Sequence, residues 1–244
     1  MKHKPRIMFR VLLPLLVTAS VMIPIASADY SERPEVQQFI SELSASDDFD
    51  AQALTGVFRE ARYKQSIIDA ISRPAERVLK WDGYQDIFLT DRRLRQGIAF
   101  EATHRELFAK AERRWGVDRW TILAILGVET SYGRNKGSYR VIDALSTLAF
   151  DYPPRSKFFK KELRELFILA REQDKSVVDL LGSYAGAMGY GQFIPSSYRA
   201  YAVDFNGDAF IDIWDEPADA IASIANYLSV HGWKPSKPVL REVT

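Results

Sequence analysis

The sequence predicts a mainly α-helical protein with little β structure. Apolar residues recur at helical spacing through most of the chain, and no run that alternates apolar and polar residues is long enough for a substantial sheet. Of the 244 residues, 47% are hydrophobic and 27% are charged. This composition suffices for a buried core in one or two domains.

Charge and residue content exclude several classes of function. The chain has 33 Lys and Arg against 32 Asp and Glu, whereas proteins that bind nucleic acid normally carry a marked basic excess. It has no cysteine, which excludes disulfides, thiolate metal sites, cysteine nucleophiles and a cysteine-linked lipid anchor. Its three histidines stand in no ligand pattern and it has no Gly-x-Ser-x-Gly motif, so zinc and serine hydrolases have no support. We therefore expect neither a nucleic-acid partner nor a lipid anchor.

Residues 1–28 have the pattern of a secretory signal peptide. Basic residues precede an apolar run over 11–25, and Ala26-Ser27-Ala28 matches a cleavage site. A retained membrane anchor is the alternative, but the run is short for a spanning helix and contains Pro14 and Pro24. Cleavage would remove only basic charges and leave a mildly acidic mature chain.

Residues 29–117 are predicted to form a helical domain. Helical spacing indicates helices over 34–45, 50–72 and 90–115, the second ended by Arg73-Pro74 and the third by Gly116. The face expected to be buried in the third helix comprises Leu94, Ile98, Ala102, Arg105 and Phe108.

Residues 118–244 are predicted to form a second domain. Its expected helices are one over 120–128 capped by Asp118, one that starts at Ser156, and one that runs from Asp215 and Pro217 to Gly232. The stretch 182–212 is rich in Gly, Ser, Tyr and Asp, so it is predicted as loops with only short strand pieces such as 210–213.

Glu129 is the first candidate catalytic residue. It follows a strongly apolar helix, so its carboxyl either faces solvent or lies in a poorly hydrated cleft, and the periodicity leaves both open. In a cleft, burial would disfavour the charged form, raise the pKa and leave a proton to donate near neutral pH. A general acid that breaks an acetal needs such a proton.

Residues 183–193 form a candidate carbohydrate cleft. They combine three glycines and two alanines with Ser183, Tyr184, Tyr190 and Gln192. Aromatic rings stack on sugar faces, and the polar groups can hydrogen-bond to hydroxyls. A glycine-rich turn with packed tyrosines is the alternative, which composition alone does not reject. The segment lacks the Gly-Lys-Ser/Thr ending of a phosphate loop.

Residues 204–212 resemble the start of an EF-hand calcium loop. Side-chain oxygens alternate at Asp204, Asn206 and Asp208, and the carbonyl of Phe210 follows. The glycine lies at loop position four instead of six, and Asp215 stands at position twelve, where a bidentate Glu is usual. A solvated Asn-Gly turn is the alternative.

Three segments together resemble the membrane-bound lytic murein transglycosylase B family. They are residues 127–133, 183–197 and 204–227, in the same order and at similar spacing, and the string Ser-Tyr-Ala-Gly-Ala-Met-Gly-Tyr-Gly-Gln-Phe is highly specific. The likeness covers about residues 84–233. It implies a lysozyme-like helical core with an additional N-terminal helical domain, acting on the glycan strands of peptidoglycan.

The resemblance also implies roles for particular residues. Glu129 would be the sole catalytic acid and base: it would protonate the oxygen between N-acetylmuramic acid and N-acetylglucosamine, then take the proton of the muramic C6 hydroxyl as that group attacks C1. The implied substrate-binding residues are Tyr84, Arg155, Ser183, Tyr190, Gln192 and Tyr227. The implied ligands of a structural Ca²⁺ are Asp204, Asn206, Asp208, the carbonyl of Phe210 and Asp219.

The expected setting is a soluble periplasmic enzyme, since the chain has a signal peptide and no cysteine. Its expected partners are glycan strands and other cell-wall enzymes. Larger members of the family continue well beyond the position of Pro235, so this chain is expected to be a short or truncated member. A non-catalytic peptidoglycan-binding or scaffold protein and a hydrolytic muramidase stay open as alternatives.

Overall fold

The computed structural model describes residues 29–73, 79–235, 237 and 239. Its α-helices are α1 (Pro34–Asp47), α2 (Ala51–Glu60), α3 (Gln65–Ser72), α5 (Trp81–Gln85), α6 (Asp91–Trp115), α7 (Arg119–Thr130), α8 (Val141–Asp151), α9 (Ser156–Glu172), α10 (Pro195–Tyr201) and α11 (Pro217–Val230). Two 3₁₀ turns, η1 (Tyr30–Glu32) and η2 (Pro153–Arg155), and two short strands, β1 (Tyr139–Arg140) and β2 (Leu181–Gly182), complete the regular structure. The strands pair antiparallel, with Tyr139 opposite Gly182. The predicted signal peptide lies outside the described residues.

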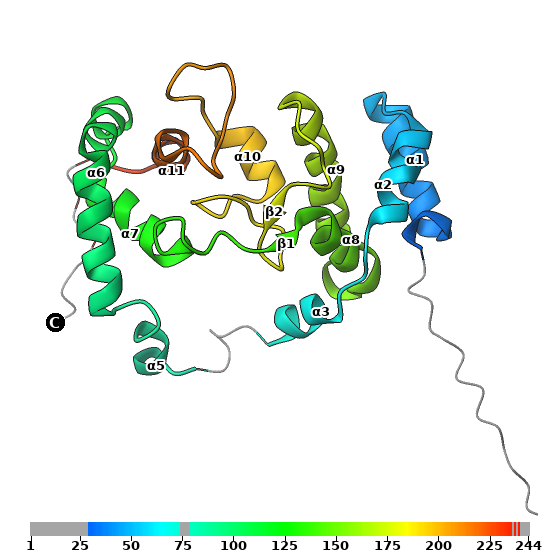
Figure 1. Ribbon diagram of the computed structural model, residues 1–244, viewed down its shortest axis with the longest axis horizontal. Helices are drawn as coiled ribbons and strands as arrows, with labels where there is room; N and C mark the ends of the chain where they lie inside the picture. The colour runs from blue at the N-terminus through cyan, green and yellow to red at the C-terminus, as the bar shows by residue number, and fades with distance from the viewer. Residues whose placement is uncertain (1–28, 74–78, 236, 238, 240–244) are drawn as a thin grey trace, which may run out of the picture.

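The helices are arranged along one long axis, with α6 at one end and α1 and α2 at the other (Figure 1). The paired strands and α7 to α11 lie between them (Figure 1). One buried apolar cluster includes residues from both halves of the chain. Arg33, at the start of α1, forms an ion pair with Asp151 at the end of α8, with 2.8 Å between Nη1 and Oδ1. The predicted division into domains at residue 117 therefore coincides with no break in the packing, and it stays a prediction.

The prediction of a mainly α protein with little β structure is confirmed. The predicted cap of α7 is also present, because the Asp118 carboxylate accepts hydrogen bonds from the N–H groups of Trp120 and Thr121. Gly116 ends α6 with a φ of 67°, in the left-handed region that glycine adopts readily. Local signals therefore sufficed for these helix ends.

The prediction of one helix over 50–72 is wrong, because the chain leaves α2 after Glu60 and starts α3 only at Gln65. The N–H of Arg62 donates to Asp143 Oδ1 at 2.8 Å, and the N–H of Lys64 donates to Thr147 Oγ1 at 3.2 Å. Hydrogen bonds to α8 thus take up donors that a continuous helix would use.

The predicted strand at 210–213 is also wrong. The backbone groups of Ile211 form hydrogen bonds with side chains and not with a neighbouring strand. The N–H of Ile211 donates to the side chain of Gln173 at 3.1 Å, and its carbonyl accepts the hydroxyl of Tyr198 at 2.7 Å. Helices α5, α8 and α10 were not predicted.

The predicted buried face of α6 is wrong except at Phe108, since Leu94, Ile98, Ala102 and Arg105 are all exposed. Leu94 is 64% exposed and Ile98 is 62% exposed. The residues of α6 that are buried are Gly97, Glu101, Phe108 and Ala111. The helix is turned this way because the ring of Tyr132 packs against Gly97: a Cβ there would lie 2.4 Å from the Tyr132 hydroxyl oxygen.

Candidate active site

Glu129 lies near the C-terminal end of α7 and lines a cavity of about 380 Å³ together with Gln192 and Tyr227. The other lining residues are Ile125, Gly191, Phe193, Ile194, Ser197, Ile224 and Leu228. Within the described part of the chain, Glu129 is the one acidic residue of the cavity wall. The cavity thus places one carboxyl in a mostly apolar wall beside an amide and a phenol.

Burial raises the pKa of the Glu129 carboxyl above its usual value. Part of the Glu129 residue is exposed to solvent, while it also lines the cavity. The apolar residues of the cavity wall exclude water that would stabilise the charged form. This carboxyl therefore retains its proton at a higher pH than an ordinary glutamate, as a general acid must.

Thr130 ties the end of α7 to the glycine-tyrosine segment. Its hydroxyl donates to the carbonyl oxygen of Tyr190 at 2.9 Å and accepts the N–H of Gly133 at 2.9 Å. The residue is 1% exposed. Because Gln192 follows Tyr190 by two residues, this link helps to place the amide of Gln192 on the same wall as Glu129.

Gly133 is required where the two segments meet. Its φ is 80°, and a Cβ at this position would lie 2.0 Å from Cε1 of Tyr190. The backbone therefore approaches the ring more closely than any other residue would allow. The two motifs that the sequence singled out separately, 127–133 and 183–193, are thus one packed unit.

Two of the predicted substrate-binding residues lie in this unit but outside the wall of the Glu129 cavity. The Ser183 hydroxyl oxygen accepts the N–H groups of Ala185 at 3.3 Å and Ala187 at 3.1 Å, so it shapes the turn. Tyr190 lines a different cavity of about 590 Å³. The ammonium of Lys136 lies 5.1 Å from the centroid of the Tyr190 ring.

Tyr84 and Arg155 each contact an aromatic ring close to them in the sequence. Tyr84 is on α5, where its ring centroid is 5.2 Å from that of Phe88. The guanidinium of Arg155 lies 4.3 Å from the centroid of the Phe158 ring. Neither residue lines the Glu129 cavity.

The apolar part of the cavity wall was missed by sequence reasoning, which considered only polar and aromatic groups. Ile125 precedes Glu129 by one helical turn, and Ile224 and Leu228 flank Tyr227 on α11. The sequence did hold a signal for two of them, because residues three or four positions apart lie on the same face of a helix. Ile125 lies four residues before Glu129, and Ile224 lies three residues before Tyr227.

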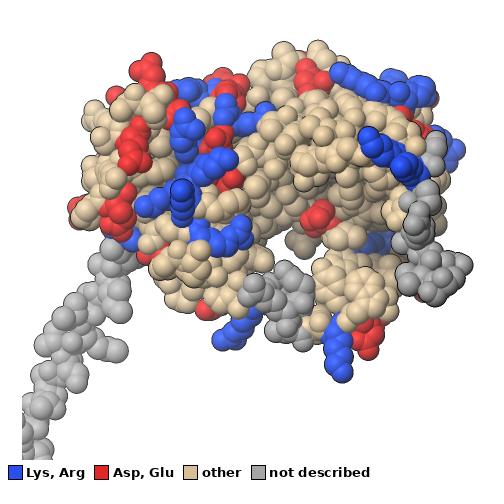
Figure 2. Space-filling model, turned by 180° about the vertical axis from the view of Figure 1, so that it is seen from behind, with Lys and Arg blue, Asp and Glu red and all other residues tan. Residues whose placement is uncertain are grey.

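The space-filling view shows a hollow between the body of the molecule and the segment that carries α5 (Figure 2). The surface around this hollow is mostly neither acidic nor basic (Figure 2). Basic and acidic side chains are mixed on the side of the molecule that carries α1, α2 and α9, and further basic side chains lie at the opposite end (Figures 1 and 2).

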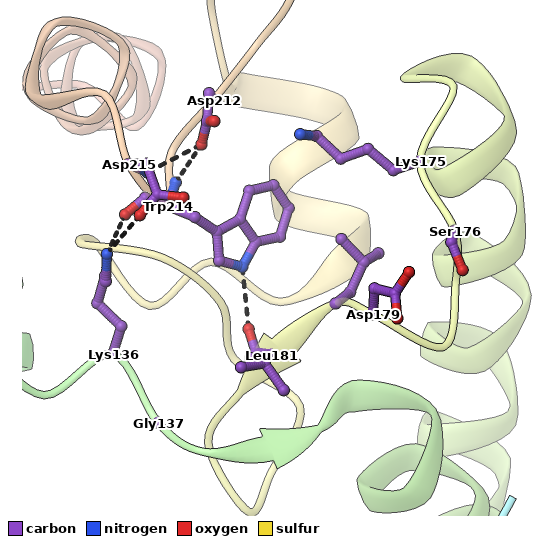
Figure 3. Close-up of a pocket in the computed structure, with 10 residues that line it drawn as sticks. Lys136, Gly137, Lys175, Ser176, Asp179, Leu181, Asp212, Trp214 and Asp215 are labelled. Carbon is purple, nitrogen blue, oxygen red and sulfur yellow. Dashed lines mark hydrogen bonds and ion pairs between the residues drawn. The ribbon is translucent and has the colours of Figure 1, made fainter.

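A separate cavity of about 360 Å³ surrounds Trp214 (Figure 3). The indole N–H of Trp214 donates to the carbonyl of Leu181 at 2.9 Å, and Lys136 forms an ion pair with Asp215 at 3.0 Å (Figure 3). The cavity shares no lining residue with that of Glu129 and contains none of the predicted site residues. The Glu129 cavity is therefore the better candidate for the active site.

The predicted calcium ligands lie in one loop, but their oxygens face backbone N–H groups. Asp204 accepts the N–H of Gly207 at 2.7 Å and that of Ala209 at 2.9 Å. Asp219 accepts the N–H of Phe205 and that of Asp212, each at 2.8 Å. In the part of the chain that the structure describes, no three acidic or histidine side chains converge enough to hold a metal ion.

The electrostatics of the loop favour a cation all the same. Burial raises the pKa of Asp219, and the negative charges of Asp204 and Asp208 raise it further. Each carboxylate oxygen that accepts one N–H keeps a second lone pair. All the predicted metal ligands of this loop are oxygen atoms, which Ca²⁺ prefers. The chemistry of the residues therefore fits this ion, and binding requires their side chains to turn toward one point.

The chain is similar to known peptidoglycan-cleaving proteins. A family described as "Transglycosylase SLT domain" matches residues 31–244. The chain is 39% identical over 214 residues to the membrane-bound lytic murein transglycosylase B of Escherichia coli, a match that covers 84% of this chain and 59% of that protein. The chain thus spans less than two thirds of the length of this curated relative.

The chain is also similar to solved structures of lytic transglycosylases. The soluble lytic transglycosylase SltB1 of Pseudomonas aeruginosa is 56% identical, with a TM-score of 0.82 over 84% of this chain and 69% of that chain. The Escherichia coli lytic transglycosylase Slt35, solved in complex with calcium, is 39% identical, with a TM-score of 0.81 over 86% of this chain and 67% of that chain. SltB3 of Pseudomonas aeruginosa, solved in complex with NAG-NAM-pentapeptide, is 32% identical, with a TM-score of 0.76 over 84% of this chain and 54% of that chain. The lysozyme-like fold predicted for the core is confirmed by these neighbours.

The described residues contain no helix that is both long and apolar enough to span a membrane.

Proposed function

Because the chain belongs to the family of transglycosylase SLT domains, which matches residues 31–244, we propose that it is a lytic transglycosylase of peptidoglycan. It cleaves the β-1,4 bond between N-acetylmuramic acid and N-acetylglucosamine and leaves a 1,6-anhydromuramic end. The observation that carries this proposal is the single carboxyl of raised pKa in the cavity wall, Glu129. Ordinary glycosidases flank the bond with two carboxyl groups, whereas an intramolecular attack needs one that acts first as acid and then as base.

Glu129 performs both proton transfers in this reaction. Its protonated carboxyl donates to the glycosidic oxygen, and the bond from this oxygen to C1 of the muramic residue breaks. The C6 hydroxyl of the same residue attacks C1, and the Glu129 carboxylate takes the hydroxyl proton. The carboxyl ends the cycle protonated, so no water is consumed. General acid and base catalysis of this kind contributes about 10²–10⁴ in rate.

Gln192 and Tyr227 hold the sugar beside Glu129. The Gln192 amide nitrogen donates to the carbonyls of Gly189 at 3.0 Å and Lys136 at 3.3 Å, which directs the amide oxygen toward donors such as sugar hydroxyls. The Tyr227 ring is stacked on the ring of His231 at a centroid distance of 4.0 Å, which makes it a rigid surface for a sugar. Tyr84 and Arg155 contact parts of the substrate beyond the cleaved bond, and Ser183 and Tyr190 support the cleft.

A calcium ion bound by Asp204, Asn206, Asp208, the carbonyl of Phe210 and Asp219 stabilises the loop before α11. Support comes from the mutual repulsion of these carboxylates and from Slt35, a relative solved in complex with calcium. The ion takes no part in the proton transfers.

The protein acts in the periplasm after removal of residues 1–28, on glycan strands and alongside other cell-wall enzymes. Support comes from the pattern of the first 28 residues and from SltB3, a relative solved with a peptidoglycan fragment.

Mass spectrometry of peptidoglycan digested by the protein tests the proposed reaction. Wild type should release products that end in 1,6-anhydromuramic acid, and Glu129→Gln should release none. Glu106→Gln, a matched change at an exposed residue of α6, should behave as wild type. Reducing-end muramic acid without anhydro products would establish a hydrolytic muramidase instead. Binding to sacculi with no cleavage by any variant would establish a non-catalytic binding protein.

Calcium binding is tested by thermal unfolding with calcium and with a chelator. Calcium should raise the Tm of the wild type, and Asp208→Ala should abolish this rise. Asp69→Ala, at an exposed position of α3, should keep it. An identical Tm for the wild type in calcium and in chelator would remove the proposed site.

A further inference from the structure

Lys136 contacts two separate segments, one through its backbone and one through its side chain. It lies between α7 and β1. Its carbonyl oxygen accepts a hydrogen bond from the side-chain nitrogen of Gln192 at 3.3 Å. Its ammonium lies 3.0 Å from the Asp215 carboxylate and also donates to the carbonyl oxygen of Trp214 (Figure 3). Lys136 therefore joins a residue of the Glu129 cavity wall to the loop before α11, residues 202–216.

The hydrogen bond to Trp214 is the stronger part of this link. The Asp215 side chain is 81% exposed, so its ion pair with Lys136 contributes little. Trp214 is buried, and a hydrogen bond from a charged donor is stronger than one between neutral groups. The Trp214 carbonyl is itself held in place, because the Asp212 carboxylate accepts the N–H groups of Trp214 at 2.8 Å and Asp215 at 2.9 Å.

The backbone of Lys136 is fixed by the residue that follows it. Gly137 has a φ of 90°, and a Cβ there would lie 2.1 Å from the carbonyl oxygen of Gly182 in β2. A side chain at this position would collide with the strand, and glycine adopts such a φ readily. The Lys136 carbonyl is therefore offered to Gln192 from a tightly packed backbone.

Gln192 needs support from its neighbours, because its φ of 51° is unusual for a residue other than glycine. Its side-chain nitrogen also donates to the carbonyl of Gly189 at 3.0 Å. A Cβ at Gly189 would lie 2.4 Å from the carbonyl oxygen of Ile213, which accepts the N–H of Tyr190 at 2.9 Å. The segment that carries Gln192 is thus packed on the same loop that Lys136 holds.

We propose that Lys136 is a positioning residue for sugar binding. Its ammonium anchors the loop before α11, and its carbonyl fixes the Gln192 amide so that the amide oxygen accepts from a sugar hydroxyl. The sugar-binding role of Gln192 rests on the proposed function. Lys136 does not line the Glu129 cavity, so it acts on the sugar through Gln192. Without the ammonium, the Lys136 backbone loses its tie to Trp214 and the Gln192 amide loses its single orientation.

The test is an equilibrium titration with a trimer of N-acetylglucosamine, followed by calorimetry. Lys136→Met removes the charge, keeps most of the side-chain length and should weaken binding about fivefold, the size expected for one hydrogen bond to the ligand. Lys136→Arg should bind within about twofold of the wild type, because a guanidinium also donates to a carbonyl. The matched control is Lys175→Met, which removes an ammonium 5.7 Å from the centroid of the Trp214 ring. It should bind as the wild type does.

A double-mutant cycle separates positioning from a general effect on the fold. Gln192→Met should weaken binding about fivefold, and adding Lys136→Met should weaken it by less than a further twofold, because both changes remove the same contact with the sugar. NMR gives an independent readout. The signal of the Gln192 side-chain amide, identified by its loss in Gln192→Met, should shift in Lys136→Met and keep its position in Lys136→Arg.

Three outcomes would overturn this inference and leave the proposed function intact. They are equal affinities of the wild type and Lys136→Met, additive effects of Lys136→Met and Gln192→Met, and an unchanged Gln192 amide signal in Lys136→Met. A wild type that does not bind the trimer would remove the sugar-binding role of Gln192 and this inference with it. The trimer contains no muramic acid, so the titration does not depend on catalysis. Failure of the proposed reaction appears separately, as the absence of anhydro products from intact peptidoglycan.

Discussion

Replacing Thr130 by valine should destabilise the protein by about 2–3 kcal/mol. Valine has nearly the shape of threonine but removes the hydroxyl, which donates to Tyr190 at 2.9 Å and accepts from Gly133 at 2.9 Å. A typical hydrogen bond contributes about 1 kcal/mol net, and a buried group left without its partner costs about 1–3 kcal/mol. Because the residue is 1% exposed, water does not replace the lost contacts easily.

Urea unfolding followed by circular dichroism measures this loss. In a chain of this size the Tm should fall by about 4–12 °C. The matched control is Thr55→Val on α2, where the hydroxyl donates only to the carbonyl of Ala51 within its own helix. It should change the free energy of unfolding by less than about 0.5 kcal/mol. Equal stabilities for Thr130→Val and wild type would show that the hydroxyl does not hold the two segments together.

Three further predictions concern the same region. Gly133→Ala should lower the free energy of unfolding by more than about 2 kcal/mol, measured in urea, because a Cβ would lie 2.0 Å from the Tyr190 ring at a φ of 80°; wild-type stability would contradict the close approach. Since burial raises the pKa of Glu129 in the folded state, the wild type should match Glu129→Gln in stability below about pH 4 and become less stable than it as the pH rises through the raised pKa; parallel stability curves would argue against the burial effect. Gly97→Ala should lower the Tm by several degrees in a thermal scan, because its Cβ would lie 2.4 Å from the Tyr132 hydroxyl oxygen; an unchanged Tm would show that the ring moves aside freely.

The helices that the sequence predicted well are those whose ends are decided locally. Asp118 and Gly116 carry their own signals, a side-chain acceptor and a left-handed φ. The break between α2 and α3 could not be found in this way, because it depends on acceptors in α8 that lie 81 and 83 residues away. Periodicity also misjudged α6, where Ile98 is exposed and Gly97 is buried. An aromatic ring from another segment decides which face of that helix is covered.

Motifs predicted the centre of the candidate site better than its periphery. Glu129, Gln192 and Tyr227 do line one cavity. Ser183 belongs to the same motif as Gln192, but its hydroxyl is turned into the backbone of its own turn. A motif identifies residues that lie near one another, whereas the direction of each side chain depends on backbone angles such as the φ of 51° at Gln192.

The pairing of the first helices with α8 and α9 sets an order of events during folding. The Tyr30 hydroxyl donates a hydrogen bond to Asp151, 121 residues later, and Arg164 pairs with Asp47 across 117 residues. Phe39 and Phe58 likewise complete their packing on Phe150. Contacts of such high sequence separation form late, since the long intervening loop must close first. While the chain is being synthesised, α1 and α2 therefore keep an aromatic face in water until α8 has emerged, and a chain that stops before that helix cannot complete this core.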